Sequence, residues 1–557
     1  MGCSPLTEKD IFTSRKHSMD YFTSDGVILR TGYKNKLDWY LLPIREGLDN
    51  AVDFLWKYYG GSDKGSIALE ITIDNLLFTI KLTNSNQRNI PVFNDLKSVF
   101  DYDVRYGSKQ NMHVINRGML GDAMKQILSL GYVLLHVNDD GRAFSDRQWD
   151  YPLVIRHNQQ ESKVFLTVDK AAQTGQVRIA HEEAKIEYPN TELEITLPII
   201  KEVQSTLTAE YIEDYCRKYS LLTTDITIKF SISDKREADI RSSNTSVVYS
   251  FDIPSTHPIN LLTNSNSIHS FTPEEFIAQF LNVHDKNSTT VYDVLKAFRE
   301  GSHIKKSEEN ELSVAKLLSM QDKEYKVERL YNHLKNVLGP ARVLPLPYKC
   351  NKKRAEILSK RAREFYDIDT EKEPSYKLVR GIYEDSLVSY PYAVEILAIP
   401  FKNPNERDSV SLCAVNYSVS PKENSLEGDY NWSDRNGNFK KANNIYEVLE
   451  KNGFHTYNGP ISRLPSLIII NLITPKRDPH GYDKSIINTK PFTVSIVAAV
   501  ARAASGIQTF RGAGYRFQDV DNYRTAKRHD INTKVNARRL LQKFLVSERG
   551  LAVTKAE

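Results

Sequence analysis

The chain has 557 residues, of which 40% are hydrophobic and 26% are charged. It can therefore bury several cores, and about three or four domains are expected. This composition excludes a disordered chain, a collagen-like repeat and a disulfide scaffold. The 75 basic and 70 acidic residues give a net charge of +5, which leaves a nucleic-acid partner open because a basic patch can lie within a balanced total.

The cysteines and the apolar runs bear on the compartment. Cys3, Cys216, Cys350 and Cys413 lie far apart and lack metal-ligand spacing, so a reducing compartment, the cytoplasm or the nucleus, is expected. No apolar run approaches the ~20 residues of a membrane span, so no membrane partner is expected.

The first region of regular pattern is a helix. Its apolar residues recur at helical spacing, while Glu46 and Asn50 share another face; the apolar set is Ile44, Leu48, Ala51, Val52 and Leu55. Alternating segments at 66–73 and 76–82, joined by Asp74-Asn75, predict a hairpin. A polar loop then leads from Thr83 to Arg117, where a further helical pattern starts.

The remaining elements follow in three stretches. An α+β stretch is expected to continue to about residue 255, with strands at 133–137, 153–156, 163–167, 176–179, 192–197 and 225–232 and a helix at 209–219. A helical stretch follows, in which Thr272 is the expected N-cap and Pro273 the first helical residue, with helices at 291–299, 308–337 and 352–366. The last stretch predicts strands at 393–399, 409–419 and 467–473, helices at 445–452 and 491–507, and a basic helical tail at 524–549.

Three features in the first part of the chain point to a triphosphate site. The helix carries Glu46 and Asn50, the hairpin ends near Asn84, and a loop with Tyr106-Gly107-Ser108-Lys109 leads into Arg117-Gly118-Met119-Leu120-Gly121-Asp122. A glycine turn at a helix N-terminus presents backbone N–H groups to phosphate oxygens. The amide oxygen of Asn50 suits Mg²⁺, and Glu46 can deprotonate an attacking water. Lys109 and Lys125 are candidates for charge on the phosphates.

Each of these features alone is weak. An exposed Glu and Asn on a helix usually form only a solvated face, a Gly-x-x-Gly turn more often marks tight packing, and a single lysine is usually a surface residue. Their order, spacing and placement together favour the nucleotide site.

These motifs resemble the Bergerat-fold, or GHKL, ATPases. Within that superfamily, Arg45-Glu46-x-x-x-Asn50, Tyr106-Gly107-Ser108-Lys109 and Arg117-Gly118-Met119-Leu120-Gly121 look most like the B subunit of the type IIB topoisomerases. The resemblance implies that Glu46 is the catalytic glutamate and Asn50 the Mg²⁺ ligand, and that Gly118 and Gly121 belong to the phosphate loop. It also implies a transducer lysine that reaches ATP, matched by position to Lys490, with Lys484 as a rival.

The sequence departs from the family at two points. The family aspartate that accepts a hydrogen bond from adenine is matched by Asn84, which keeps an acceptor oxygen but has no charge. The third glycine of the phosphate loop is Ala123. These departures leave ATP hydrolysis less certain than ATP binding.

The resemblance implies an α+β chain of three parts. A Bergerat ATPase sandwich is expected over about 1–255, a helix-two-turn-helix-like insert over about 256–345, and a transducer-like α+β domain with a long C-terminal helix over about 346–557. ATP and Mg²⁺ would close a homodimer, which would act on DNA with a separate DNA-cleaving A-type subunit.

Two alternatives stay open: an ATP-gated clamp resembling MutL or a chaperone, and a scaffold that activates a DNA-cleaving partner after losing its own ATPase activity.

Overall fold

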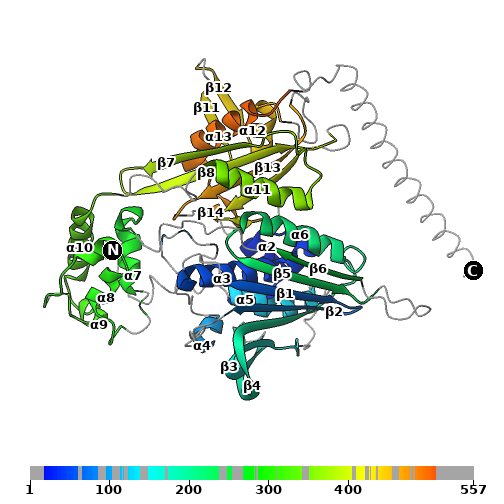
Figure 1. Ribbon diagram of the computed structural model, residues 1–557. Helices are drawn as coiled ribbons and strands as arrows, with labels where there is room; N and C mark the ends of the chain where they lie inside the picture. The colour runs from blue at the N-terminus through cyan, green and yellow to red at the C-terminus, as the bar shows by residue number, and fades with distance from the viewer. Residues whose placement is uncertain are drawn as a thin grey trace, which may run out of the picture.

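The computed structural model describes residues 18–59, 65–85, 96–102, 113, 115, 117, 123–137, 148–169, 174–236, 247–253, 267–281, 283, 286–308, 310–340, 351–403, 409–420, 426, 428–433, 437–454, 463–476, 479–480 and 483–509. They form two β-sheets flanked by helices and a separate group of helices beside them (Figure 1). The expected α+β class is confirmed.

The first sheet has six strands in the order β3-β4-β2-β1-β5-β6. Its strands are β1 (Ser66–Ile73), β2 (Leu77–Ser85), β3 (Leu153–Asp169), β4 (Thr174–Pro198), β5 (Thr227–Asp234) and β6 (Val247–Ile253). Buried and less buried residues alternate along β1 and β2, so one face of this part of the sheet packs on the core while the other is more open. The predicted hairpin of β1 and β2 is confirmed.

Helices cover the core face of this sheet. They are α2 (Ser24–Thr31), α3 (Leu41–Tyr59), the short α4 (Leu96–Phe100), α5 (Ala123–His136) and α6 (Ala209–Leu222), with the 3-10 turns η1 (Ser18–Phe22) and η2 (Lys36–Tyr40) before α3. Helix α3 contacts β2, α5 contacts β4, and α6 contacts β5.

Two expectations for this region were wrong in detail. Residues 133–136 belong to α5, not to a strand, because α5 is buried along eleven consecutive residues from Met124 to Leu134 and a short apolar run in such a helix looks like a strand. The four short strands expected between 153 and 197 merge into β3 and β4, which pair antiparallel with irregular register between Arg156 and Gln160.

The helical group has its own core of aromatic and aliphatic side chains, among them Phe271, Phe276, Phe298 and Leu334. Its elements are η3 (Ile268–Ser270), α7 (Pro273–Leu281), α8 (Val291–Lys296), η4 (Glu300–His303), α9 (Val314–Leu318) and α10 (Lys323–Val337). Thr272 caps α7 as expected, since its hydroxyl accepts a hydrogen bond from the Glu275 N–H (3.2 Å). The single helix expected over 308–337 was wrong: Ser313 caps the separate α9.

The second sheet has the strand order β10-β9-β13-β8-β7. Its strands are β7 (Ser375–Glu384), β8 (Ser389–Pro400), β9 (Val410–Val415), β10 (Ser418–Val419) and β13 (Ser466–Ile473). Strands β8 and β13 are buried on both faces and therefore read as continuous apolar runs. Helix α11 (Asn351–Phe365) packs on one face, while α12 (Ile445–Lys451) and α13 (Thr493–Ser505) enclose a core on the other (Figure 1). Small hairpins, β11 (Tyr430–Ser433) with β12 (Phe439–Ala442) and β14 (Pro479–His480) with β15 (Asp483–Ile487), and the turn η5 (Lys490–Phe492) complete this part.

The first sheet's helices and the second sheet share one hydrophobic core. Leu48 and Val52 of α3, Leu358 of α11, Leu397 of β8 and Ile469 of β13 belong to the same cluster of buried residues. The two sheets are therefore joined by continuous apolar packing. Helix α3 packs in the same core as strands β8 and β13 of the second sheet.

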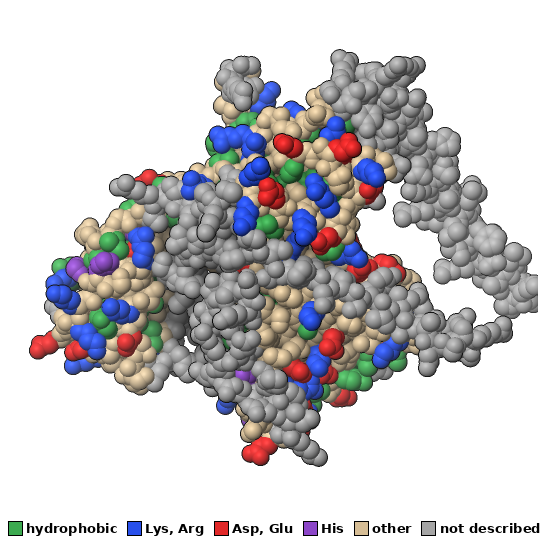
Figure 2. All heavy atoms as spheres, viewed as in Figure 1, with side chains coloured by type: hydrophobic (Ala, Val, Ile, Leu, Met, Phe, Trp, Pro, Cys, Tyr) green, Lys and Arg blue, Asp and Glu red, His purple; other side chains and the backbone are tan. Residues whose placement is uncertain are grey.

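Among the helices described, none is both long and apolar enough to cross a bilayer. On the face seen in Figure 2, basic and acidic side chains are interspersed over the helical group and the second sheet. The basic tail at 524–549 lies outside the described residues.

Candidate functional site

Helix α3 presents a polar stripe on the side away from its apolar face. The predicted apolar residues are all buried (Ile44, Leu48, Ala51, Val52 and Leu55). At ~100° per residue, Glu46, Asn50 and Asp53 fall on the opposite side, where Glu46 and Asn50 are half-buried and Asp53 is buried. The helix and its two faces are therefore as expected.

The flank of α3 nearest to β2 is marked by Gly47. A Cβ placed on Gly47 would lie 3.4 Å from Leu82 Cδ1, so the helix backbone passes close to β2 at this point. Asn50 is one turn further along α3, and Asn84 is two residues further along β2.

Asn84 is a buried polar residue whose acceptor is unused. It lies on β2 between Ile67 of β1 and Thr191 of β4 and is 6% exposed. Within the part of the chain that the structure describes, its Oδ1 has no hydrogen-bond partner. Such an acceptor costs the unliganded protein about 1–3 kcal/mol, a cost that a ligand donor can remove.

The start of the predicted phosphate loop is fixed to α3. The backbone N–H of Arg117 donates a hydrogen bond of 2.8 Å to Asp53 Oδ1, within one turn of Asn50. Helix α5 begins at Ala123, six residues after Arg117. Gly118, Met119, Leu120, Gly121 and Asp122 themselves lie outside the described residues, as do Ser108 and Lys109.

The side chain of Arg117 points into the protein. It is 2% exposed, and its Nη1 donates to the hydroxyls of Tyr219 (2.7 Å) and Thr223 (2.8 Å) at the end of α6. Burial lowers the pKa of Arg117, but Tyr219 and Asp49 outweigh burial and leave the pKa above its usual value. The guanidinium is thus held charged between α3 and α6, in a position suited to anchoring the loop.

Three of the four predicted lysines are among the described residues, and they lie in different places. Lys125 is fully buried in the first turn of α5, where its carbonyl accepts from the Tyr102 hydroxyl (3.1 Å). Lys490 is exposed at the start of η5. Lys484 lies on β15, which contacts α2 of the first sheet's helical layer. The roles assigned to these lysines stay predictions.

Three residues outside the expected site join separate parts of the structure. Lys476, just after β13, donates to both carboxylate oxygens of Glu275 on α7 (2.9 Å each). His113, four residues before Arg117, lies 4.0 Å from Glu275 Oε1 and stacks on Phe271. Burial is the main cause that lowers the pKa of His113 to about 4, and Lys476 adds to it while Glu275 opposes it. Sequence spacing gives no signal for this contact, because its members come from distant segments.

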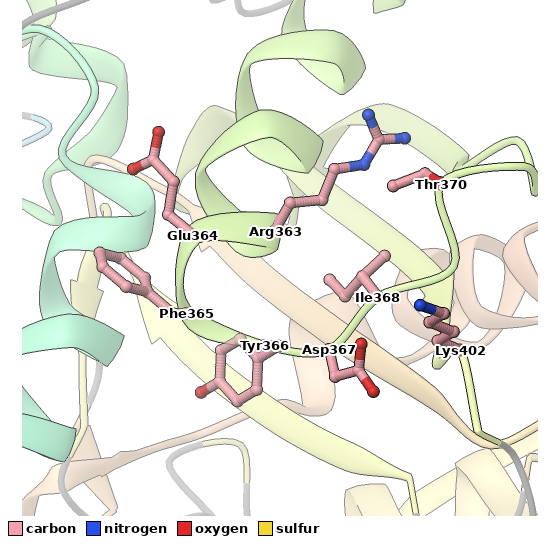
Figure 3. A pocket seen from close by; sticks show the side chains of 8 residues that line it. All are labelled: Arg363, Glu364, Phe365, Tyr366, Asp367, Ile368, Thr370 and Lys402. Atoms are coloured by element: carbon pink, nitrogen blue, oxygen red, sulfur yellow. The ribbon is translucent and has the colours of Figure 1, made fainter.

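A cavity that none of the predicted site residues lines opens at the end of α11. It has a volume of about 460 Å³. Figure 3 shows its lining side chains, none of which is a predicted site residue: Arg363, Glu364, Phe365, Tyr366, Asp367, Ile368, Thr370 and Lys402. They come from the end of α11, the segment after it and the residue after Phe401.

Comparison with protein-family models and with curated proteins finds no match. Among solved structures, the chain is similar to the N-terminal domain of a DNA repair protein (10% identity, TM-score 0.32, covering 84% of this chain and 96% of that one). It is also similar to the B subunit of DNA gyrase from Myxococcus xanthus (9%, 0.30, 84% and 87%). A third similarity is to the ATP-binding domain of topoisomerase IV from Francisella tularensis, solved with a small-molecule inhibitor (11%, 0.29, 88% and 92%). These values are low, so the function proposed below is argued from the geometry of the site.

Proposed function

We propose that the chain binds and hydrolyses ATP between α3, the end of β2 and the loop that precedes α5. The observation that carries this proposal is the hydrogen bond from the Arg117 N–H to Asp53. It holds Arg117, the residue before the predicted glycine loop, against α3 within one turn of Asn50; we propose that the N–H donors of this loop border the same space as the polar stripe of α3. Arg117 then acts as the anchor of the loop.

The buried acceptor of Asn84 supports a nucleotide rather than a simple phosphate ligand. Its Oδ1 is shielded from water and lacks a partner among the described residues. The exocyclic amino group of adenine is a donor that would satisfy it. The deprotonated oxygens of a phosphate group are acceptors and offer nothing to this atom.

The residues of α3 suit the chemistry of phosphate transfer. Asn50 would hold Mg²⁺ through its amide oxygen, and the ion would supply positive charge to the phosphates. Glu46, one turn earlier on the same stripe, would orient the attacking water and accept its proton. The donors of the loop at a helix N-terminus would hold the phosphate oxygens.

At the level of the assembly, we propose a B-subunit-like component of a type IIB topoisomerase. ATP binding would favour a closed homodimer, because a ligand shifts an equilibrium toward the state that it binds more tightly. The shared core of the two sheets offers a direct route from the nucleotide to the second sheet. A separate DNA-cleaving subunit would then carry out strand passage.

Calorimetric titration of a Mg²⁺-bound, non-hydrolysable ATP analogue into the full-length protein tests the site. Binding by the wild type and a loss of about tenfold or more in Asn50→Ala are expected. Full affinity in Asn50→Ala would remove Asn50 from the site, and no binding by the wild type would refute the proposal.

A DNA relaxation assay on a mixture of this protein and a DNA-cleaving subunit tests the assembly. Relaxation that depends on ATP is expected. Dimerisation on ATP without relaxation would identify a nucleotide-gated clamp instead.

A further inference from the structure

Asp49 lies within the polar segment of α3 but faces away from the proposed nucleotide. It is three residues after Glu46 and one before Asn50, and it is 2% exposed. Its Oδ1 accepts a hydrogen bond from the Tyr219 hydroxyl of α6 (2.8 Å), and its Oδ2 accepts one from the Ser418 hydroxyl of β10 (2.7 Å). Both carboxylate oxygens are thus used, one toward each neighbouring element.

Ser418 belongs to a tight hairpin of the second sheet. The turn residues between β9 and β10 are Asn416 and Tyr417, with φ of 49° and 69°, the left-handed values that a two-residue hairpin turn requires. Asn416 exchanges hydrogen bonds with the backbone of Thr474 (2.9 and 2.8 Å), and the Tyr417 N–H donates to Asn471 Oδ1 (3.0 Å). The turn is therefore fixed to β13 and its end and should move with the second sheet.

The same hairpin is seated against the helices of the first sheet. The Tyr215 hydroxyl of α6 donates to the Val419 carbonyl (3.3 Å). The ring of Tyr417 meets Trp56 of α3 edge to face, with centroids 6.0 Å apart. Within this contact, Asp49 supplies the charged acceptor, so its bond to Ser418 is expected to be stronger than a bond between neutral groups.

Asp49 also balances buried positive charge. Arg45 Nε lies 3.8 Å from Asp49 Oδ2, and the carboxylate helps to keep the pKa values of Arg45 and Arg117 above their usual level, against the effect of burial. Arg45 adjoins Glu46 in the chain, and Arg117 anchors the loop. A change at Asp49 therefore reaches both sides of the proposed site.

We propose that Asp49 is a positioning residue: through Ser418 it makes the placement of Glu46 and Asn50 depend on the position of the β9–β10 hairpin. When the second sheet shifts, the hairpin carries Ser418 with it and α3 follows through the charged hydrogen bond. This inference rests on the proposed function for its catalytic readout, but the mechanical link can be measured without nucleotide.

The first arm of the test measures amide hydrogen exchange in the full-length protein without nucleotide. Ser418→Ala is expected to speed exchange in α3 around residues 46–53, although Ser418 lies in the other sheet. Ser418→Thr keeps the hydroxyl and should restore the wild-type rate. Ser359→Ala is the matched control, because it removes an equally buried serine hydroxyl whose partner, among the described residues, is within α11: the Ala355 carbonyl (2.6 Å).

The second arm is a double-mutant cycle on ATP turnover with Asp49→Asn and Ser418→Ala. Each single change is expected to lower kcat by about tenfold, the effect of weakening a hydrogen bond to a charged group, with much less change in nucleotide Kd. Ser418→Ala also removes the hydrogen bond that Ser418 Oγ accepts from Arg45 Nε (3.4 Å). The double variant should fall little further, since both changes break one link.

Unchanged α3 exchange in Ser418→Ala, or losses that multiply in the double variant, would overturn the inference. If the wild type binds no nucleotide, the proposed function fails, and the exchange arm still decides the link by itself.

Discussion

The unused acceptor of Asn84 makes a prediction in which stability and binding move in opposite directions. Asn84→Leu replaces a buried amide, whose Oδ1 has no partner among the described residues, with an apolar side chain of similar size. Removing the unsatisfied acceptor should stabilise the unliganded protein by about 1–2 kcal/mol, the lower part of the penalty for such a group. Nucleotide affinity should fall by about tenfold, because the donor on the base loses its acceptor.

Asn471→Leu is the matched control, since Asn471 is also a buried strand asparagine but has both ends occupied. Its Oδ1 accepts from the Tyr417 N–H (3.0 Å) and its Nδ2 donates to Glu395 (3.1 Å). Leucine there should destabilise the protein by about 2–4 kcal/mol. Urea unfolding measures the change in stability, and calorimetric titration measures the change in nucleotide affinity. A loss of stability in Asn84→Leu, or unchanged nucleotide affinity, would show that Asn84 Oδ1 does not accept a hydrogen bond from a ligand.

Three further predictions concern catalysis, pH and a buried ion pair. Glu46→Ala should bind the ATP analogue normally but lower turnover by about 10²–10⁴-fold in a phosphate-release assay; normal turnover would remove Glu46 from its role. The pKa of His113 falls from 6.5 to about 4 on folding, so the unfolded chain binds more protons than the folded chain between these pH values. The free energy of unfolding of the wild type should therefore decrease by up to ~3 kcal/mol as pH falls from 6.5 to 4. His113→Phe should flatten that part of the urea-unfolding profile, and an identical profile would contradict the shift. Glu395 is 1% exposed and lies 2.6 Å from Arg354 Nε. Arg354→Met leaves it as an uncompensated buried charge and should lower the free energy of unfolding by about 3–5 kcal/mol. The control Lys306→Met, at an exposed ion pair, should change the free energy of unfolding by less than about 1 kcal/mol.

Local pattern was enough to predict the elements that carry the proposed site. Apolar spacing on α3 placed Leu48 and Val52 in the core and left Glu46 and Asn50 on the other side. The strand expected at 133–137 failed because burial of α5 on all sides removes the amphipathic signal that separates helix from strand. Strand β7 was not predicted: among the described strands it pairs with β8 alone, at the edge of the sheet, and it is only partly buried.

The partners of the site residues could not be read from the sequence. Asp49 and Ser418 are 369 positions apart, and nothing in their local sequence indicates that they meet. Lys476 and Glu275 are 201 positions apart in the sequence, and only the folding of the chain brings them together. Sequence pattern therefore gives the candidate side chains on one helix, while long-range packing decides which of them face the proposed nucleotide site and which hold the helix in place.

The continuous core across α3, α11 and β8 limits how this chain can be divided. In a fragment that ended near residue 255, the apolar side chains that Leu358, Leu397 and Ile469 cover would be exposed to solvent. Such a fragment should aggregate or bind other exposed hydrophobic surfaces. Any evolutionary rearrangement that separated the two sheets into different polypeptides would first have needed new polar residues along this seam.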